Sequence, residues 1–357
     1  MRNLPRVSAV LVIALGLGVS HIGFAQRGAS VQPTTAAAAS TTARVVAAAQ
    51  AVLTSLDESG RAKVQFPFEG PQKTRWSNLP TGIFARQGLR LGDLTPNQHA
   101  VVMTLLSTAL SANGFRKVTQ IMQGDEYLRT TGGGRGGRGG RAGGGGGLVF
   151  GDDEYYLAFL GAPSTSSPWM LQFGGHHLAI NLTMAGSQAS MTPSLPAAEP
   201  ATFTFEGREI RPLGSEIDKG FALVNALDAA QRGRAVLNYR VADLVLGPGQ
   251  DGRVIQPEGI PASALSPAQQ QALVDVVREW AGIMADGYAE ARMAEIRATL
   301  PQTYFAWSGE TAPDSVSYFR IQGPTLVIEF APQGSLNHIH TIYRDPTNDY
   351  GARLVAK

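Results

Sequence analysis

Residues 94–98 read LTPNQ, and a similar stretch, LSPAQ, follows at residues 265–269. In the first stretch Thr95 suits the N-cap of a helix, Pro96 its first position, and Gln98 the return hydrogen bond of a capping box. The second stretch has matching residue types at the same places. Both therefore predict the start of a long helix, and their similarity raises the question of an internal repeat.

The first predicted helix runs to about Asn113-Gly114, because these residue types favour a helix end. The second runs to roughly Thr299. Another helical pattern begins at Arg44 and consists of apolar residues at helical spacing: Val45, Val46, Ala49, Val52, Leu53 and Leu56. Residues 26–43, which are mostly Ala, Ser, Thr and Gln, are expected to form a disordered leader.

One constant offset relates two parts of the chain, and it is the offset between Thr95 and Ser266. Besides the helix starts, it relates Leu56-Asp57 to Leu227-Asp228, Arg61 to Arg232, Lys63 to Arg234, and Gly88-Leu89 to Gly259-Ile260. A series of matches at one offset indicates an internal duplication of about 170 residues. The expected fold class is α+β, with two pseudo-equivalent halves that each contain a helical pair followed by β-hairpin strands, packed as one compact unit.

The segments expected to form strands align less closely, at a shorter offset. EYYLAFLGAP at residues 154–163 resembles SYFRIQGP at residues 317–324, which would make GGHHLAINL and NHIHTIY equivalent segments of the two halves. We therefore predict a first half at residues 44–185 and a second half at residues 203–357. Residues 186–202, which are rich in Pro, Ala and Ser, are expected to be the linker between them.

Residues 132–147 hold 12 glycines and 3 arginines. Such a tract can bind nucleic acid, or it can be a flexible surface loop inserted between a helix and a strand. Without Arg2 and Arg6, which precede the expected cleavage site, the chain carries 28 basic and 28 acidic residues. This balance favours the loop, and we expect neither a nucleic acid nor an anionic membrane surface as a partner.

Residues 1–25 have the features of a secretory signal peptide. Arg2 and Arg6 precede an apolar segment at residues 7–19, and small residues at positions 23 and 25 favour cleavage after Ala25. No later apolar run is long enough for a transmembrane helix. The absence of cysteine excludes a lipid-anchored cysteine, disulfides and thiolate metal ligands. We expect export through Sec to the periplasm or the extracellular space.

Four segments carry a resemblance to a protein family. They are RWSNLP at 75–80, EYYLAFLGAP at 154–163, W-x-x-Q-F-G-G-H-H-L-A-I-N at 169–181, and HIHTIYRDPTNDYG at 338–351. With them the chain resembles, from about Ala48 to Gly351, the bacterial family named domain of unknown function 3500. The glycine tract departs from the family pattern and falls in a predicted loop. The family name carries no activity, so the resemblance implies membership and no mechanism.

Four histidines in two of these segments are candidate metal ligands. Alternate residues of a strand face the same side, so His338 and His340 can reach one ion. His176 and His177 are adjacent and would point to opposite faces, unless a bulge at Gly174-Gly175 redirects them. If the halves pack about a pseudo-two-fold axis, three or four imidazoles meet. Such a set suits Zn first, with Cu or Fe as alternatives, and leaves a position for water.

Charged residues near these histidines are candidates for catalysis. Glu329 lies in TLVIEF, the expected hairpin partner of the strand with His340, and Asp345 follows that strand. Either can bind the metal, act as general base or orient an imidazole. Arg344 suits a carboxylate or a phosphate. The competing interpretation is structural: histidines bonded across a sheet, and a turn at residues 344–349 with a local salt bridge.

The leading hypothesis from the sequence is an exported metal-dependent hydrolase, in which metal-activated water attacks a small substrate. A Cu or Fe oxidase or oxygenase is an alternative within the same class of site. A non-catalytic periplasmic protein that binds a metal or a small ligand is the alternative from a different class. In each case we expect a small-molecule partner and no protein partner.

Overall fold

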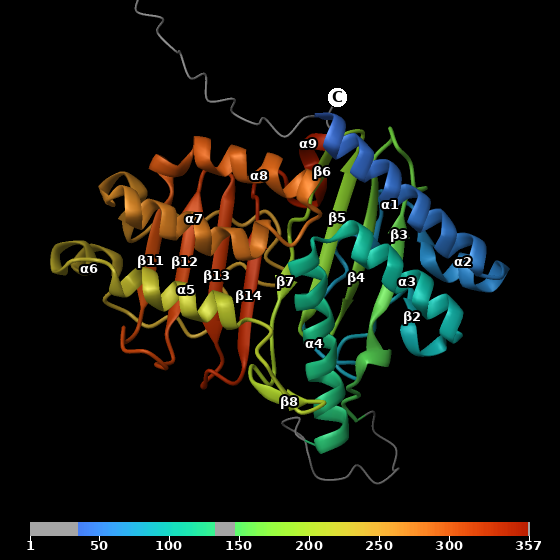
Figure 1. Ribbon diagram of the computed structural model, residues 1–357, viewed down its shortest axis with the longest axis horizontal. Coiled ribbons are helices and arrows are strands. Elements are labelled where there is room, and N and C mark those ends of the chain that lie inside the picture. The colour runs from blue at the N-terminus through green and yellow to red at the C-terminus, as the bar shows by residue number, and fades with distance from the viewer. Residues whose placement is uncertain (1–34, 133–146, 356–357) are drawn as a thin grey trace, which may run out of the picture. The chain divides into compact units, whose positions relative to one another are not determined.

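The computed structural model describes residues 35–132 and 147–355 of the 357-residue chain. The described residues combine helices with antiparallel sheets, which confirms the α+β class (Figure 1). The expected signal peptide, the first part of the expected leader, and nearly all of the glycine tract lie outside the described residues. The expected hairpins are present, and the two helices expected after Thr95 and Ser266 start where these capping residues predict.

The first sheet pairs seven strands of the described chain. They are β1 (Gln65–Phe66), β2 (Leu89–Arg90), β3 (Tyr156–Leu160), β4 (Trp169–Gly175), β5 (Leu178–Ala185), β6 (Gln188–Ser190) and β7 (Leu195–Pro196). The order is β1-β3-β4-β5-β6, with β2 paired to β3 and β7 paired to β5. Short β1 and β3 run parallel, and every other pair is antiparallel.

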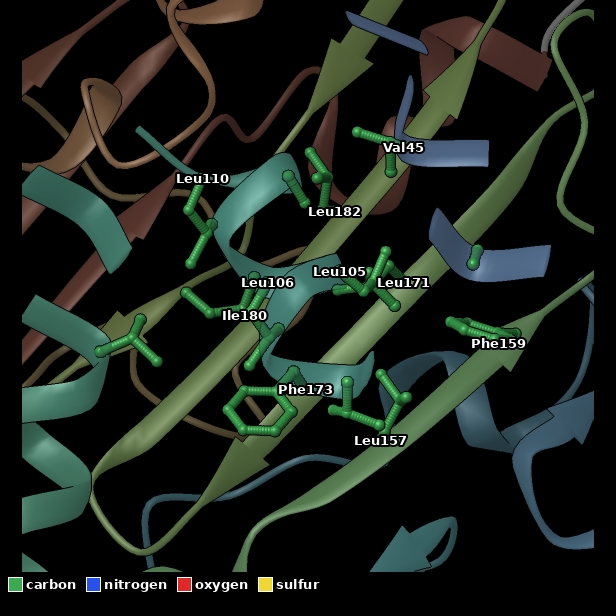
Figure 2. Close-up of a cluster of buried hydrophobic side chains, with 14 of the residues drawn as sticks. Val45, Leu105, Leu106, Leu110, Leu157, Phe159, Leu171, Phe173, Ile180 and Leu182 are labelled. Carbon is green, nitrogen blue, oxygen red and sulfur yellow. The ribbon is translucent and has the colours of Figure 1, made fainter. Parts of the chain in front are cut away.

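Among the described residues, four α-helices precede β3: α1 (Thr35–Ser55), α2 (Glu58–Val64), α3 (Pro96–Ala109) and α4 (Ala112–Thr131). Alternate residues of β3, β4 and β5 face a core that α1, α3 and α4 complete. Figure 2 shows this layer, with Leu105 and Leu106 of α3 among Leu171, Phe173 and Ile180 of the sheet. Each large apolar side chain buried there contributes about 1.5–3 kcal/mol.

The second sheet follows the order of the chain: β10 (Ile260–Pro261), β11 (Tyr304–Ser308), β12 (Tyr318–Gly323), β13 (Leu326–Pro332) and β14 (Ile339–Arg344). The helices of this part are α5 (Gly214–Asn225), α6 (Ala229–Ala235), α7 (Pro267–Ala281), α8 (Asp286–Ala298) and α9 (Ala352–Val355). Residues of α5, α7 and α8 share a core with one face of the sheet. Strands β8 (Phe203–Phe205) and β9 (Arg208–Ile210) form a separate hairpin.

Short 3-10 helices lie between these elements: η1 (Pro71–Thr74), η2 (Leu91–Asp93), η3 (Asp152–Glu154), η4 (Ala262–Ala264), η5 (Leu300–Gln302) and η6 (Asp349–Gly351).

Helices cover one face of each sheet, while the opposite face carries a third apolar cluster to which both sheets contribute. Trp76, Ala179 and Ile342 belong to this cluster.

Of the two long helices expected from the capping boxes, the first ends before Asn113-Gly114 and the second is broken in the middle. The first ends at Ala109, and Ser111 caps a new helix, because the Ser111 N–H bonds to Ile283 O and the Ala285 N–H bonds to Ala109 O, both at 3.0 Å. The second helix is interrupted between Ala281, where α7 ends, and Asp286, where α8 begins. Gly114 is therefore no helix end: it lies inside α4, where a Cβ would collide with Ile283 O.

The expected disordered leader is helical over its described part, since α1 begins at Thr35. Thr42 is buried, and its Oγ1 lies 2.7 Å from both Gly186 O and the Tyr288 hydroxyl. These tertiary contacts order a segment whose composition alone indicates disorder. By length and composition α1 could also cross a membrane, but its buried residues pack into the core of the protein.

Residues 186–202 are not a loose linker. They contain β6 and β7, and residues 191–198 are buried. Ser194 and Ala198 each exchange two backbone hydrogen bonds with β14, at Tyr343 and Ile339, over 2.8–2.9 Å. Because β7 also pairs with β5, this segment lies between the two sheets and joins them. Its Pro, Ala and Ser residues indicated a linker, whereas small side chains here permit close packing between sheets.

The strand alignment assumed from the sequence is wrong. In the first sheet Leu89 of β2 pairs with Leu157 of β3, and in the second Ile260 of β10 pairs with Phe305 of β11. By this pairing β11 takes the place in the second sheet that β3 takes in the first, and the β12–β13 hairpin takes the place of the β4–β5 hairpin. NHIHTIY instead leads into β14, one strand later, so it does not occupy a place equivalent to GGHHLAINL.

Candidate metal centre

His176 and His177 form the two-residue turn of the β4–β5 hairpin, in which Gly175 pairs directly with Leu178. No bulge redirects them: the turn itself does, because His177 adopts the left-handed conformation with φ 58°. The Tyr155 hydroxyl donates to His176 O over 2.9 Å, and only a glycine at 175 leaves room for the Tyr155 ring. The two imidazoles consequently lie together, with ring centroids 3.7 Å apart.

Backbone hydrogen bonds fix where the turn faces. The His177 N–H donates to Asn78 O over 3.1 Å, and His177 O accepts from the Ala197 N–H over 2.8 Å. Ala197 belongs to the segment that joins the sheets, and its neighbour Ala198 bonds to Ile339 of β14. The turn is thereby held beside the start of β14, where His338 and His340 lie.

Three imidazoles meet at this place. His177 Nε2 lies 3.1 Å from His338 Nε2, which lies 3.1 Å from His340 Nε2, and each residue offers a nitrogen within 4.8 Å of the others. Nitrogens that bind one zinc ion at about 2.0–2.1 Å in tetrahedral geometry are about 3.4 Å apart. The three Nε2 atoms can therefore bind one ion after small movements.

Carboxylates face the remaining ring nitrogens of three histidines. Asp243 lies 3.1 Å from Nδ1 of His340, and Glu199 lies 3.4 Å from Nδ1 of His338. Asp125 lies 2.6 Å from Nδ1 of His176. A carboxylate at Nδ1 fixes the proton there, orients the ring and makes Nε2 a better ligand. The arrangement is that of imidazoles prepared to bind a cation through Nε2.

Burial decides the protonation of the central imidazole. Loss of solvent, with a further contribution from the neighbouring histidines, holds the pKa of His177 well below its usual range. His177 is therefore neutral near pH 7, which is the form that binds metals. Burial raises the pKa of Asp125, against the opposing effect of its hydrogen bond with His176.

The family model described as "Protein of unknown function (DUF3500)" matches residues 38–352. The chain belongs to this family. No curated protein and no solved structure gives a match. The histidine turn and the strand with His338 and His340 both lie within the matched residues, and so do the three carboxylates. Any chemistry of this DUF3500 protein must therefore be argued from its own side chains.

In the DUF3500 protein Glu329 lies on the same face of the second sheet as His340, but its carboxylate bonds to groups other than the histidines. It is fully buried in β13, where its carboxylate accepts from the Tyr318 hydroxyl and from the backbone N–H groups of Val245 and Leu246, over 2.5–3.0 Å. These bonds hold the loop that also carries Asp243. Glu329 therefore supports the loop that carries Asp243. Its carboxylate oxygens are bonded within the protein, so the contacts do not support the general-base role expected for it.

Arg344 and Asp345 are likewise used elsewhere. Arg344 donates to Asp251 and Asp349, over 3.0 and 2.8 Å, and to two backbone carbonyls. Asp345 accepts from Thr347 and from Arg353. A strand rises about 3.3 Å per residue, which puts Arg344 about 13 Å along β14 from His340. The interpretation as a turn with salt bridges fits these residues, and a role at the imidazoles does not.

Sequence reasoning missed four residues of this site: Asn78, Asp125, Glu199 and Asp243. Nδ2 of Asn78 lies 3.2 Å from Nε2 of His340. All four are far from the histidines in sequence or lie in the supposed linker, so no spacing rule connects them. The one usable signal was RWSNLP, a family segment that contains Asn78 but suggests no role for it.

Proposed function

We propose that this DUF3500 protein binds a divalent transition metal, with Zn favoured, through Nε2 of His177, His338 and His340, and that metal-bound water hydrolyses a small substrate. The observation that supports it is the convergence of three Nε2 atoms, with successive separations of 3.1 Å, from segments far apart in sequence. Three imidazoles leave the fourth tetrahedral position for water.

The second layer of the site supports the same proposal. The carboxylates of Asp243 and Glu199 keep the Nδ1 protons on His340 and His338, so both rings present Nε2 as a lone-pair donor. A zinc ion on three imidazoles lowers the pKa of its bound water to about 7. Hydroxide can then form near neutral pH without a dedicated general base, which suits a site that Glu329 and Asp345 do not reach.

A second candidate function is metal binding without catalysis. The observation in its favour is that Asn78 Nδ2 contacts Nε2 of His340, so that the amide must move for this nitrogen to bind an ion. A site that closes over its ion in this way suits storage or delivery as well as hydrolysis. A panel of ester, amide and phosphoester substrates with the zinc-loaded protein separates the two candidates.

The test of the metal site uses protein purified without a polyhistidine tag. We expect zinc to remain bound after gel filtration and to rebind after chelation. His338→Ala and His340→Ala should each lower the affinity by more than about 100-fold, since removal of an outer-shell partner alone costs about 10–100-fold. His99→Ala is the matched control, because His99 lies in α3. No zinc, copper or iron binding by the unsubstituted protein would contradict the proposal.

We also propose that the protein is exported and acts in the periplasm or outside the cell. The support is the pattern of residues 1–25, with two arginines, an apolar segment and small residues before position 26. Detection of a mature N-terminus at Gln26 in the periplasmic fraction or in the medium tests this. A full-length cytoplasmic protein would contradict it.

Internal duplication is a further proposal on the fold, and repeated hydrogen bonds support it. The side chain of Gln98 donates to Ser55 O over 2.9 Å. At the offset that relates the two helix starts, Gln269 donates to Ala226 O over 2.7 Å. Arg61 bonds to Leu56 O, and Arg232, its counterpart at the same offset, bonds to Leu227 O. A common ancestor of both parts explains why side chains as well as helix starts recur.

A further inference from the structure

A second set of possible ligands adjoins the three-histidine site and shares one residue with it. His176, His177 and Glu199 each offer a ligand atom, and these atoms lie within 4.8 Å of one another. His176 and His177 are buried, and the Glu199 side chain is 18% exposed. The site of the proposed function does not use His176, although its Nδ1 is held by a buried carboxylate as firmly as that of any ligand.

His177 differs from its three neighbours in one respect. His176, His338 and His340 each have a carboxylate near Nδ1. Nδ1 of His177 is buried and has no hydrogen-bond partner among the described residues. If Nε2 alone bound a metal, the neutral ring would carry a proton on Nδ1, and this buried N–H would lack an acceptor. Metal-bound histidines almost always donate that proton to a carboxylate, a carbonyl or water.

We propose that the centre is dinuclear and that His177 bridges the two ions as an imidazolate. Nε2 of His177 binds the ion held by His338 and His340, and Nδ1 binds a second ion held with His176 and Glu199. The Nδ1 proton is released to solvent as the second ion binds, so the ring becomes an anion between two cations. The bridge uses the nitrogen that is otherwise unsatisfied. This inference rests on the proposed metal site.

His176 is suited to the second ion. Asp125 lies 2.6 Å from its Nδ1 and leaves Nε2 as the ligand nitrogen, and the Phe150 ring packs against the imidazole with centroids 5.1 Å apart. Asp125 and His176 are both nearly inaccessible to solvent. A buried carboxylate–histidine pair beside a second histidine is the environment in which Nε2 of His176 would serve as a ligand.

Glu199 connects the two ions. One of its oxygens lies 3.4 Å from Nδ1 of His338, and the same carboxylate belongs to the ligand set with His176 and His177. It thus orients a ligand of the first ion and supplies an oxygen ligand to the second. Its negative charge, together with that of the imidazolate, offsets part of the charge that a second dication adds to a buried site.

The test counts metal ions. Metal-free, untagged mature protein is titrated with zinc and the bound metal is measured after gel filtration. We expect two zinc ions per chain for the unsubstituted protein and one for Glu199→Gln, because the amide has nearly the size of the carboxylate but is a weak zinc ligand. Glu206→Gln is the matched control: Glu206 is exposed in the β8–β9 turn, and two ions should remain.

Copper tests the bridge itself. Two Cu²⁺ ions joined by an imidazolate are antiferromagnetically coupled, so the EPR signal should grow up to one equivalent of copper and decrease with the second. In Glu199→Gln the uncoupled signal of one ion should remain. This measurement needs no substitution of a buried histidine, and thermal unfolding of Glu199→Gln verifies that the variant is folded.

The outcomes separate this inference from the proposed function. One zinc ion per chain in both the unsubstituted protein and Glu199→Gln overturns the dinuclear centre and leaves the three-histidine site standing. Two zinc ions with a copper signal that doubles at the second equivalent overturn the imidazolate bridge. No bound metal at all overturns the proposed function, and with it this inference.

Discussion

His177 Nε2 lies 3.1 Å from His338 Nε2, although 161 residues separate them in the chain. Their approach depends on residues 194–198, which pair with β5 on one side and with β14 on the other. The two sheets therefore meet at a strand that belongs to neither hairpin. A site at such a junction is assembled only when both sheets have folded, and metal binding should accordingly stabilise the folded protein.

The first prediction concerns Asp243→Asn. The aspartate lies 3.1 Å from Nδ1 of His340, and its side chain is 54% exposed. Loss of its charge weakens the ligand without opening a cavity, so we expect zinc affinity to fall about 10–100-fold. The temperature of unfolding of the metal-free protein should hardly change. Competition with a zinc chelator measures the affinity, and the exposed Asp153 supplies the control Asp153→Asn. Equal affinities in the two variants would exclude an orienting role for Asp243.

The starts of the two long helices could be predicted from the sequence, because the capping residues that indicate them are local. Thr95 and Ser266 both form complete capping boxes, as predicted from five residues around each. The breaks after Ala109 and Ala281 could not be predicted from the sequence, since they depend on backbone hydrogen bonds between the α3–α4 connection and the α7–α8 connection. Gly114 had suggested the end of a helix, whereas in the structure its lack of a side chain lets the backbone of Ile283 pack closely against α4.

The metal site could be predicted only in part, because some of its residues form a local sequence pattern and others are brought together only by the fold. His-x-His on a strand is a local pattern, and the structure does place His338 and His340 with Nε2 atoms 3.1 Å apart. The turn conformation of His177 also depends on Tyr155, which directly precedes β3 and whose ring and hydroxyl contact the turn. Asp125 and Asp243 approach from elements distant in sequence, and no spacing within the sequence indicates such contacts.

A second prediction tests the hairpin turn through Gly175→Ala. A Cβ at Gly175 would lie 2.6 Å from the Tyr155 ring, so the turn or the ring must move. We expect a loss of about 1–3 kcal/mol in the free energy of unfolding, as for other overpacked sites. Zinc affinity should fall as well, because His176 and His177 follow directly. Denaturant unfolding measures the first effect. Gly233→Ala in α6 is the control: its Cβ meets nothing, and alanine there should stabilise by about 0.5–1 kcal/mol.

A third prediction concerns alkaline pH and the packing of α1. Burial raises the pKa of Tyr288 to about 12, against a hydrogen bond with Thr42 that favours the ionised form. Between pH 10 and 12 the unfolded chain loses this proton and the folded protein keeps it, so stability falls as pH rises through this range. Tyr288→Phe should cost about 0.5–1.5 kcal/mol at pH 7, by loss of the Thr42 bond, and should lose less stability than the parent from pH 10 to 12. Denaturant midpoints across this range measure the difference, and parallel curves would contradict it.

The last prediction compares His177→Gly with His177→Ala. Both variants lose the central imidazole, so both should lose high-affinity zinc binding. They differ in the backbone, because φ at this position is 58°, a conformation that costs a non-glycine residue about 1–2 kcal/mol. Glycine adopts it without strain. We therefore expect the metal-free His177→Gly protein to be more stable than His177→Ala by about 1 kcal/mol in denaturant unfolding. An imidazole kept in a strained turn, where glycine would be more stable, is expected if the ring is retained for binding. Equal stability of the two variants would show that the turn relaxes once the ring is gone.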